Sequence, residues 1–597
     1  MNALRTLLPY YKPYRRTVAF GLISVVISVT LFNLIPMLLE AAIDDMRAGR
    51  PARDVWIVAG QMVAITLVMA FFRWQMRETL NGVSRHIEND LRDDLFAHLA
   101  TLDAGFYART RTGEIMARLT NDLGAVRMAA GPAIMYLTNT IFGGLAALVF
   151  MLRISPSLTG LAVLPMVLLP VVMLKLGKAV HDRFEAVQAH FGDLTTMAQE
   201  NLSGVRIVRA YRQERAEHQQ FAAMSTEYVN RNMRLARLYG LMNPSFTVLA
   251  GLGAATVLGV GGSLVLRGAM SVGAFVAFGF YLSNLTWPLI ALGWVTNLFQ
   301  RGAASMARLN ELFAERAVIA SPTASAALPT TTGGRSIEFR SVSFAYPLRE
   351  HTDGAAPREI LHDVSFTIPA GGTLGVVGAT GSGKSTLLDL IPRIFDTTSG
   401  AVLIDGIPVT ELNIDALRRE IGFVPQESLL FSDTILANLA YGGTSHEDAR
   451  WAAEVAQLAE TIADFPDGYD TLLGERGINL SGGQKQRAAM ARALARRPTI
   501  VILDDALSAV DTHTEAAILR GLREALAGRT AIIASHRITA IRDATHIIVL
   551  DEGRIVEQGT HDTLIALRGR YWTSRPAARG CRGWWRGPGH ESQRRER

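Results

Sequence analysis

The sequence predicts two domains of different structural class: an α-helical transmembrane domain with about six spanning helices, followed by an α/β nucleotide-binding domain with a phosphate-binding loop. Three observations predict this fold. The first half of the chain contains uncharged runs long enough to cross a bilayer. The second half alternates short β-branched runs with helical patterns. Between one such run and a helical pattern lies the glycine-rich stretch Gly378–Thr386.

Composition supports a membrane protein of more than one domain. The chain has 597 residues, of which only 19% are charged, and its mean hydropathy is +0.19. Its single cysteine, Cys581, excludes an internal disulfide framework. The net charge of +6 fits cytoplasmic loops beside anionic lipid better than nucleic-acid binding.

Six runs meet the length of about 20 apolar residues that a spanning helix requires. They are Thr17–Leu39, Val55–Phe72, Pro132–Leu152, Ser157–Leu174, Met242–Leu266 and Val272–Leu298. The first run is longer than the apolar core of a signal peptide and lacks a small-residue cleavage site, so we expect it to be retained. A soluble six-helix core would not produce uncharged runs this long.

The connections between the runs predict the topology. Arg73–Gly131 and Lys175–Gly240 are long, highly charged and helical in pattern, whereas the other links are short. Arginine-rich segments beside spans lie on the cytoplasmic side, which places the N-terminus and everything after Leu298 in the cytoplasm. Each long loop is broken by an irregular turn, at Asp103–Tyr107 and at Asn201–Gly204. These turns could contact a following domain or simply close solvated hairpins.

A change of composition after Phe313 marks a boundary between domains. The segment Ala317–Arg335 is rich in Ala, Ser, Thr, Pro and Gly, which indicates an exposed linker. The alternating run Ser336–Phe344 predicts a half-buried strand that ends near Tyr346. An exposed aromatic ring there could stack on a purine base, although a tyrosine at a strand end need have no such role.

The glycine-rich stretch predicts a site for a nucleoside triphosphate. Its glycines let successive backbone N–H groups point at a phosphate, and the following helix adds the positive end of its dipole. Lys384 would supply a charge to the β- and γ-phosphates, and the Ser385 hydroxyl would bind Mg²⁺. The expected ATP-binding residues of the loop are Gly378, Thr380, Gly381, Ser382, Gly383, Lys384, Ser385 and Thr386.

Two acidic residues follow a predicted buried strand. Thr499–Leu503 is a short β-branched run that ends in Asp504 and Asp505. A carboxylate at this tip, here Asp504, would lie beside the phosphate loop and hold Mg²⁺, directly or through water. Asp505 would orient or deprotonate a water aimed at the γ-phosphate. The alternative is a pair of structural acids.

Further motifs resemble the ATP-binding cassette (ABC) family. Leu480–Gln484, with the sequence LSGGQ, is similar to the family signature, and the resemblance implies ATP contacts from Ser481, Gly482, Gly483 and Gln484. Tyr346 resembles the adenine-stacking aromatic residue. Gln426 resembles the glutamine that contacts Mg²⁺ and the transmembrane half, and His536 the histidine that contacts the γ-phosphate. Ser508–Asp511 resembles the D-loop, and Thr471–Gly477 a loop that touches the intracellular helices in exporters.

Six spans ahead of one cassette resemble the multidrug-type exporter half-transporters. In that group two cassettes face head to tail, so that Ser481 and Gly483 of one subunit would close over the γ-phosphate held by Lys384 of the other. ATP binding would join the cassettes and hydrolysis would release them, and the long loops would switch the side of the membrane that the substrate cavity faces.

One residue departs from the family pattern, which has Asp-Glu where this chain has Asp504-Asp505. A shorter side chain displaces the carboxylate by roughly 1 Å, and misplacement on this scale can cost about 10²-fold in rate. The sequence resembles subunits of heterodimeric bacterial exporters that carry this change. We therefore expect a heterodimer, in which this chain hydrolyses ATP weakly and its signature completes the productive site of the partner.

These observations predict a transmembrane domain at 1–315, a linker at 316–335, a cassette at 336–570 and a disordered basic tail at 571–597. A frame-shifted end of the coding sequence is an alternative for the tail.

We expect a multi-pass protein of the bacterial cytoplasmic (inner) membrane. It should contact lipid and an unknown small molecule, and we expect it to bind no nucleic acid. Aromatic and polar residues of the last span, such as Asn284 and Trp287, could line a cavity for it. The alternatives are a homodimeric lipid flippase and an ATP-gated regulatory protein with little hydrolysis.

Overall fold

The computed structural model describes residues 2–331, 333–346, 358–474, 477 and 479–573. The chain divides into two compact units. A helical unit comprises Met1–Ala100 and Gly113–Glu315, and a second unit comprises Thr101–Thr112 and Arg316–Arg597. The division after Glu315 falls where the composition of the sequence changes.

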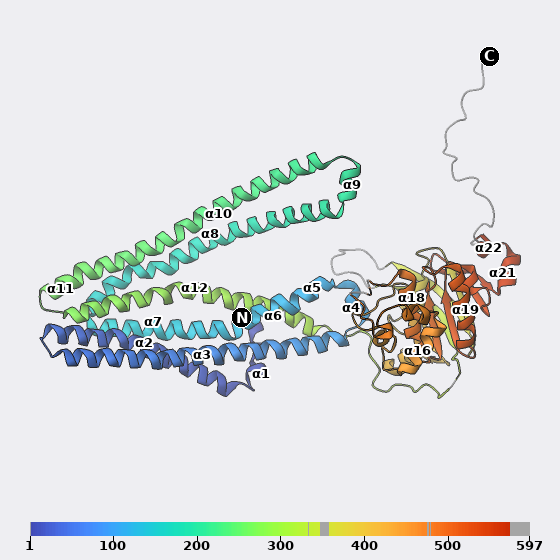
Figure 1. Ribbon diagram of the computed structural model, residues 1–597, viewed down its shortest axis with the longest axis horizontal. Coiled ribbons are helices and arrows are strands. Elements are labelled where there is room, and N and C mark those ends of the chain that lie inside the picture. The colour runs from blue at the N-terminus through green and yellow to red at the C-terminus, as the bar shows by residue number, and fades with distance from the viewer. Residues whose placement is uncertain (1, 332, 347–357, 475–476, 478, 574–597) are drawn as a thin grey trace, which may run out of the picture. The chain divides into compact units, whose positions relative to one another are not determined.

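The helical unit consists of long helices joined by short turns (Figure 1). The long helices are α2 (Arg15–Arg47), α3 (Ala52–Thr101), α7 (Ile134–Ile154), α8 (Pro156–Ser203), α10 (Glu214–Thr256) and α12 (Val272–Ala314). Shorter segments are η1 (Asn2–Leu7), α1 (Leu8–Tyr11), α5 (Thr112–Ala117), η2 (Arg118–Asp122), α6 (Leu123–Met128), η3 (Ala129–Ala133), α9 (Val205–Ala210), η4 (Val257–Gly261) and α11 (Gly262–Leu266).

The helices agree with the predicted membrane spans. Within the described residues, 5 helical stretches are long and apolar enough to cross a membrane, and they contain the first, second, third, fifth and sixth predicted spans. The fourth, Ser157–Leu174, lies on α8, where the apolar run found among the described residues is the shorter Pro156–Met166. The helical transmembrane class is therefore confirmed, and the fourth span stays a prediction.

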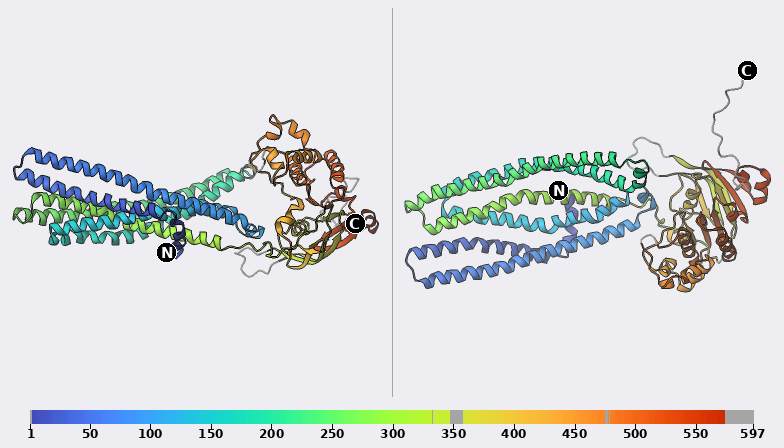
Figure 2. Two further views of the ribbon diagram at one scale, coloured as in Figure 1. Left: turned by 90° about the horizontal axis from the view of Figure 1, so that it is seen from below. Right: turned by 45° about the horizontal axis from the view of Figure 1, so that its top comes forward.

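The two predicted breaks in the long loops lie where one helix begins or another ends. Asp103 caps α4 (Ala104–Arg109) by accepting a hydrogen bond from the Phe106 amide at 3.1 Å. By its contacts the surrounding stretch, Thr101–Thr112, belongs to the second unit. The other predicted break, Asn201–Gly204, is the end of α8 with its cap Gly204, after which α9 joins α8 to α10. These two helices pack side by side over most of their length (Figure 2).

The second unit contains two sheets. The smaller has the antiparallel order β2-β1-β4-β5, from β1 (Ile337–Ala345), β2 (Glu359–Ile368), β4 (Ser399–Ile404) and β5 (Ile407–Pro408). The larger has the order β10-β9-β3-β8-β7-β6, from β3 (Thr373–Gly378), β6 (Ile421–Val424), β7 (Ile500–Asp504), β8 (Thr530–Ala534), β9 (His546–Asp551) and β10 (Arg554–Gly559).

The burial of the strands of the larger sheet agrees with their order. The strands β9, β3, β8, β7 and β6 are parallel neighbours. Every residue of β7 and of β8 is buried, as expected for central strands of a parallel sheet that is covered on both faces. The apolar residues on the two faces form separate cores, one of which includes Leu503 and the other Ile502.

Helices complete the second unit. They are α13 (Lys384–Leu390), α14 (Ile414–Arg419), α15 (Ile435–Leu439), α16 (His446–Val455), α17 (Ala459–Ala463), η5 (Gly468–Asp470), α18 (Gly482–Ala495), α19 (Thr512–Ala525), α20 (Ile538–Ile541), α21 (His561–Leu567) and α22 (Arg570–Thr573). The predicted α/β class is confirmed. Two residues of the predicted exporter-contact loop Thr471–Gly477, Glu475 and Arg476, lie outside the described residues.

Buried side chains lie next to both predicted boundaries of the cassette, 336 and 570. Arg335, the last residue of the predicted linker, is 2% exposed and pairs with Asp405 at 2.8 Å and Glu420 at 3.2 Å. Tyr571, which we expected to lie in the tail, is fully buried, and its hydroxyl lies 2.8 Å from Nδ1 of His561. The first residues of the predicted tail, 571–573, therefore belong to helix α22, and the rest of the predicted tail lies outside the described residues.

Candidate functional site

The phosphate loop runs from the end of β3 to the start of α13. Gly383, just before α13, has φ of +100°, a conformation that L-residues with a side chain rarely adopt. At Gly378 a Cβ atom would lie 2.3 Å from the Leu550 carbonyl oxygen and 2.4 Å from Oγ of Ser382. Glycine is therefore needed at both ends of the loop, for its backbone conformation at one and for close packing at the other.

Lys384 folds back over this loop. Its ammonium group donates hydrogen bonds of 2.9 Å to the carbonyl oxygens of Gly378 and Ala379. Burial lowers the pKa of Lys384, against the opposing charges of Asp504 and Asp505. The Lys384 ammonium is thus held at the phosphate loop, where it could contact a bound phosphate. Both acids are close enough to favour its charged form.

The two acids at the tip of β7 have different surroundings. Asp504 is 4% exposed, and burial raises its pKa against the opposing hydrogen bond from Ser385. Asp505 is less buried and has φ of +47°, while its amide donates to the Ala534 carbonyl oxygen at 2.9 Å. Aspartate tolerates this left-handed conformation better than most residues with side chains.

Sheet register brings the sequence-predicted residues to one edge. Val376 of β3 and Asp504 of β7 both pair with Ala534 of β8, and Leu503 pairs with Val424 of β6. Because neighbouring parallel strands end at the same edge, the residues that follow them gather there. These residues are Gly378 at the end of β3, Asp504 at the end of β7 with Asp505 directly after it, His536 after β8, and Gln426 after β6.

Tyr346 lies beside the same loop. Its hydroxyl is 3.0 Å from Oγ1 of Thr386, and its ring packs edge-on against Phe344 and Phe395. The side chain is 37% exposed. A partly exposed ring fixed next to the phosphate loop is suitably placed to stack on a base.

The signature residues form the start of α18. The Ser481 hydroxyl accepts from the Gln484 amide at 3.3 Å, and the Gln484 side chain accepts from the Ser481 amide at 2.8 Å, which makes a capping box. A Cβ on Gly483 would lie 2.7 Å from the Ala509 carbonyl oxygen. Among the described residues, no hydrogen bond joins Ser481–Gln484 to the phosphate loop Gly378–Thr386.

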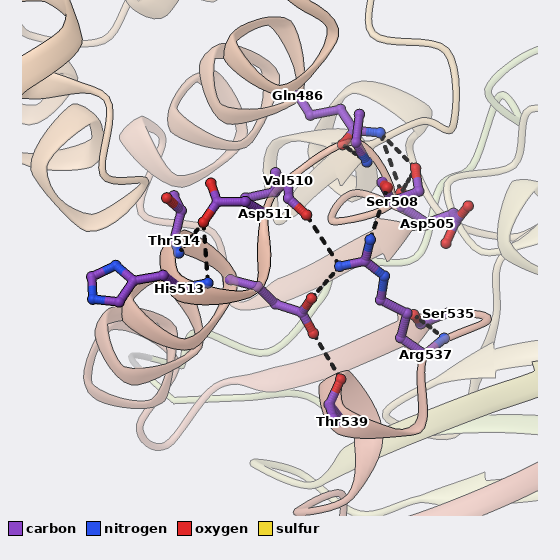
Figure 3. Close-up of polar contacts among 12 residues, drawn as sticks. Gln486, Asp505, Ser508, Val510, Asp511, His513, Thr514, Ser535, Arg537 and Thr539 are labelled. Atoms are coloured by element: carbon purple, nitrogen blue, oxygen red, sulfur yellow. Dashed lines mark hydrogen bonds and ion pairs between the residues drawn. The ribbon is translucent and has the colours of Figure 1, made fainter. Parts of the chain in front are cut away.

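A polar network links α18 to the D-loop, Ser508–Asp511 (Figure 3). The Gln486 amide donates to Oγ of Ser508 at 2.9 Å and accepts from the Ala509 amide at 3.0 Å. Arg537 donates 3.1 Å hydrogen bonds to the carbonyl oxygens of Ser508 and Val510. No sequence pattern assigns a role to Gln486 or Arg537, although each lies next to a predicted motif residue.

Glu515 anchors this network from α19. Its carboxylate is 5% exposed, forms an ion pair with Arg537 and accepts a hydrogen bond from the Thr539 hydroxyl at 2.7 Å.

Replacement of Glu515 by glutamine, Glu515→Gln, is expected to cost about 1–3 kcal/mol of stability, because a charge-assisted hydrogen bond is lost. Thermal unfolding would measure this cost, and hydrogen exchange at Ser508–Asp511 should accelerate. Glu524→Gln, an exposed site on the same helix, is the control, and equal effects of both variants would contradict the anchoring role.

Asp389 gives the unit a predicted pH dependence. Burial raises the pKa of this α13 carboxyl to about 6, and Asp504 adds to the rise. Its contribution to stability is therefore complete below about pH 4 and is lost as pH rises through 6. Without nucleotide, Asp389→Asn is expected to stabilise the protein by about 1–2 kcal/mol at pH 7.5 and to have little effect at pH 4.5. The figure allows for solvent screening, because the Asp389 carboxylate is only partly buried. Thermal unfolding at the two pH values would check this, with the exposed Asp464→Asn as control; equal effects of Asp389→Asn at both pH values would contradict it.

The oxygen donors at the strand tip fit Mg²⁺. This ion is usually bound by one or two carboxylates, phosphates and water, without an all-protein cage. Ser385 and Asp504 already share a hydrogen bond, and Gln426 follows the adjacent strand β6. Among the described residues no cluster of three or more His, Cys, Asp or Glu side chains could hold a metal by itself.

Comparison with known families gives two matches. Residues 18–289 match the family described as "ABC transporter transmembrane region", and residues 361–508 match the family described as "ABC transporter". Together these matches cover the spans up to the first part of α12, and the phosphate loop, the two acids and the signature, whereas His536 lies beyond the second match.

Several named proteins are similar to this chain over nearly its whole length. A probable multidrug resistance ABC transporter ATP-binding/permease protein, YheI of Bacillus subtilis, is 37% identical over 96% of both chains. The multidrug resistance-like ATP-binding protein MdlA of Escherichia coli is 36% identical over 92% of both. An ATP-dependent lipid A-core flippase of Syntrophus aciditrophicus is 33% identical over 96% of this chain and 94% of its own.

A solved structure shares the fold. A bacterial Atm1-family ABC exporter with ATP bound superimposes with a TM-score of 0.75 at 30% sequence identity. The match covers 95% of this chain and 99% of that one.

Proposed function

Because the chain belongs to the ABC transporter family, we propose that it exports an amphipathic small molecule, drug or lipid across the bacterial cytoplasmic membrane as one half of a dimeric transporter. A cassette that hydrolyses ATP and a multi-pass helical domain lie in the same chain. The observation that carries the proposal is the common sheet edge of the phosphate loop, Asp504, Asp505, His536 and Gln426.

In this proposal, each residue of the edge has a role in hydrolysis. Lys384 exchanges its two loop carbonyls for the β- and γ-phosphates, and the loop amides bind the remaining oxygens. Mg²⁺, held by Ser385, Asp504 and Gln426, would neutralise phosphate charge. Asp505 accepts a proton from the attacking water, and His536 contacts the γ-phosphate.

The signature is proposed to act on the nucleotide of the other subunit. Ser481 and Gly483 start a 14-residue helix whose first N–H groups suit an anion. Within the described residues they have no hydrogen bond to the chain's own phosphate loop, whereas Gln486 ties the same helix to the D-loop. A head-to-tail dimer would bring the signature of one cassette to the Lys384 of the other.

The partner is proposed to be a different half-transporter that carries glutamate at the position of Asp505. The support is chemical: the shorter carboxylate is displaced from the attacking water by roughly 1 Å. A homodimer that flips lipid is the second candidate, and the similarity to a protein named as a lipid A-core flippase favours it.

Transport in inside-out vesicles tests the proposal. The vesicles would contain this chain alone or with a co-expressed neighbouring half-transporter, and ATP-dependent uptake of fluorescent amphipaths and lipids would be measured. Uptake only with the partner supports the heterodimer, and uptake by the chain alone supports the homodimer. ATP binding without uptake or substrate-stimulated hydrolysis in either sample would contradict export.

A further inference from the structure

The helical unit contains a cavity of about 470 Å³ with both apolar and polar side chains in its lining, from α2, α3, α7 and α12. We call it the arginine cavity, because its charged lining residues are Arg73 and Arg77 of α3. Asn139 of α7 and Asn284 of α12 add amide groups, and Phe32 and Trp287 add aromatic rings. Its volume lies within the usual range of small-molecule sites, about 300–1,000 Å³.

The α2 and α12 walls of the arginine cavity belong to predicted membrane spans, and on α3 the half-buried Arg73 directly follows the second span while Arg77 is exposed. Asn33, in its α2 wall, lies roughly 24 Å along the helix from the start of the uncharged run at Thr17, and Trp287 lies roughly 22 Å from Val272. Sequence alone assigned Arg73 to the charged stretch after the second span. Its packing instead places its side chain among residues of two other spans.

The two arginines lack a compensating acid. Among the described residues, no carboxylate lies within 4.0 Å of either guanidinium, and no acidic residue lines the cavity. The contact found is a cation–π one, with the guanidinium carbon of Arg73 5.4 Å from the centre of the Phe32 ring. Ionisable groups at membrane depth are costly, and they characteristically face an aqueous or substrate pathway.

The spacing of the arginines adds to this cost. Residues four apart lie on the same face of a helix, where like charges destabilise each other. An anion between the guanidinium groups would remove the repulsion and accept charge-assisted hydrogen bonds from both. The half-buried amides of Asn139 and Asn284 have no hydrogen bond within the described residues, so they too could bind the ligand.

We infer that the arginine cavity binds the anionic head of an amphipathic molecule, a carboxylate or a phosphate, with an aromatic or aliphatic part against Phe32 and Trp287. The inference rests on the proposed export function and names its substrate class. The recognition group is the pair Arg73 and Arg77, which selects anions over cations of the same shape.

A second cavity of the same unit has a different charge. It measures about 620 Å³ and is lined by Glu40 and Asp44 near the end of α2, together with Arg153 of α7. Two carboxylates against one arginine disfavour an anion there. An anion that moved from the arginine cavity to this one would therefore bind more weakly, which suits release.

Three pyrene probes of the same size test the inference: 1-pyrenebutyrate, 1-pyrenebutanol and 1-pyrenebutyl-trimethylammonium. The full-length transporter, in phosphatidylcholine nanodiscs, would be titrated with each probe while energy transfer from tryptophan to pyrene is measured. We expect saturable binding that favours the anion over the cation by about tenfold or more. The saturable signal should fall in Trp287→Phe, which locates the probe.

Charge-neutral variants test the named residues. Arg73→Gln with Arg77→Gln should weaken binding of pyrenebutyrate by about tenfold or more and leave pyrenebutanol binding unchanged, which also shows that the variant is folded. The matched control is Arg267→Gln, an exposed arginine after α11, which should bind all three probes as the original protein does. Adding phosphatidylglycerol to the nanodiscs asks whether a lipid phosphate is the natural anion, since it would then compete with pyrenebutyrate.

Equal or tighter binding of the cation would overturn the inference, as would the absence of saturable pyrenebutyrate binding or an anion preference that survives both substitutions. Competition by phosphatidylglycerol supports a lipid headgroup as the anion, and lack of competition supports a free amphipath. Uptake into inside-out vesicles separates this result from the proposed function. ATP-driven uptake of the cation alone would support export and overturn the anionic substrate class. Anion-selective binding without any uptake would support the anionic class and contradict export.

Discussion

Replacing Lys384 by alanine is expected to reduce ATP hydrolysis by about 10²–10³-fold, since this lysine is the cation that the phosphate loop presents to the developing charge on the γ-phosphate. In the structure its ammonium is already positioned by two 2.9 Å hydrogen bonds to the carbonyl oxygens of Gly378 and Ala379. Alanine would leave these carbonyls facing the phosphates without a neutralising charge. Phosphate release by the purified transporter, with its partner if one is required, measures the effect.

The control for this experiment is Lys178→Ala, an exposed lysine on α8. This substitution removes a lysine ammonium group from the helical unit and should leave ATP hydrolysis unchanged. ATP binding should also be measured, since loss of affinity and loss of rate are separate effects. A Lys384→Ala protein that hydrolyses ATP within a factor of three of the original would show that the loop is not the hydrolytic site.

Lengthening the second acid, Asp505→Glu, is expected to raise ATP hydrolysis by up to about 10²-fold, because it moves the carboxylate roughly 1 Å closer to the attacking water. The backbone at this position is fixed by the 2.9 Å hydrogen bond from its amide to the Ala534 carbonyl oxygen. The change therefore acts mainly through the reach of the side chain. Hydrolysis by the chain alone, and with a co-expressed half-transporter, is the measurement.

Asp505→Asn distinguishes the two explanations of a low rate. If the aspartate is a weak but working base, asparagine should abolish the remaining activity, whereas an idle site would lose nothing. Asp464→Glu, an exposed aspartate after α17, controls for the added methylene. Brisk hydrolysis by the unmodified chain alone, little changed in Asp505→Glu, would contradict the weak-site hypothesis and favour a homodimer.

Much of the site could be predicted because its residues are close in sequence or follow recognisable strands. Gly383 of the phosphate loop meets a local backbone requirement that glycine satisfies easily, whereas Gly378 is needed because a Cβ there would meet Leu550, which is distant in sequence. Asp504 follows a β-branched run, which is the pattern typical of a strand buried on both faces of a parallel sheet. The capping box of Ser481 and Gln484 likewise depends on residues three apart.

Residues that act through partners distant in sequence were not predicted. Arg537 holds the D-loop through two carbonyl oxygens and is itself held by Glu515, which no local pattern reveals. Arg73 and Arg77 follow an apolar run and resemble the first charges of a cytoplasmic loop. Their facing cavity exists only because α2, α7 and α12 pack against α3.

The sequence by itself determined the fold class of each half, the family and the residues of the phosphate loop, because helix length, strand periodicity and glycine conformation are local properties. Tertiary structure alone decided which strand ends meet, since the order β3-β8-β7-β6 brings together residues as distant as Gln426 and His536. It also decided that two arginines of a helical segment line a cavity. Both depend on packing between distant parts of the chain, which local patterns do not encode.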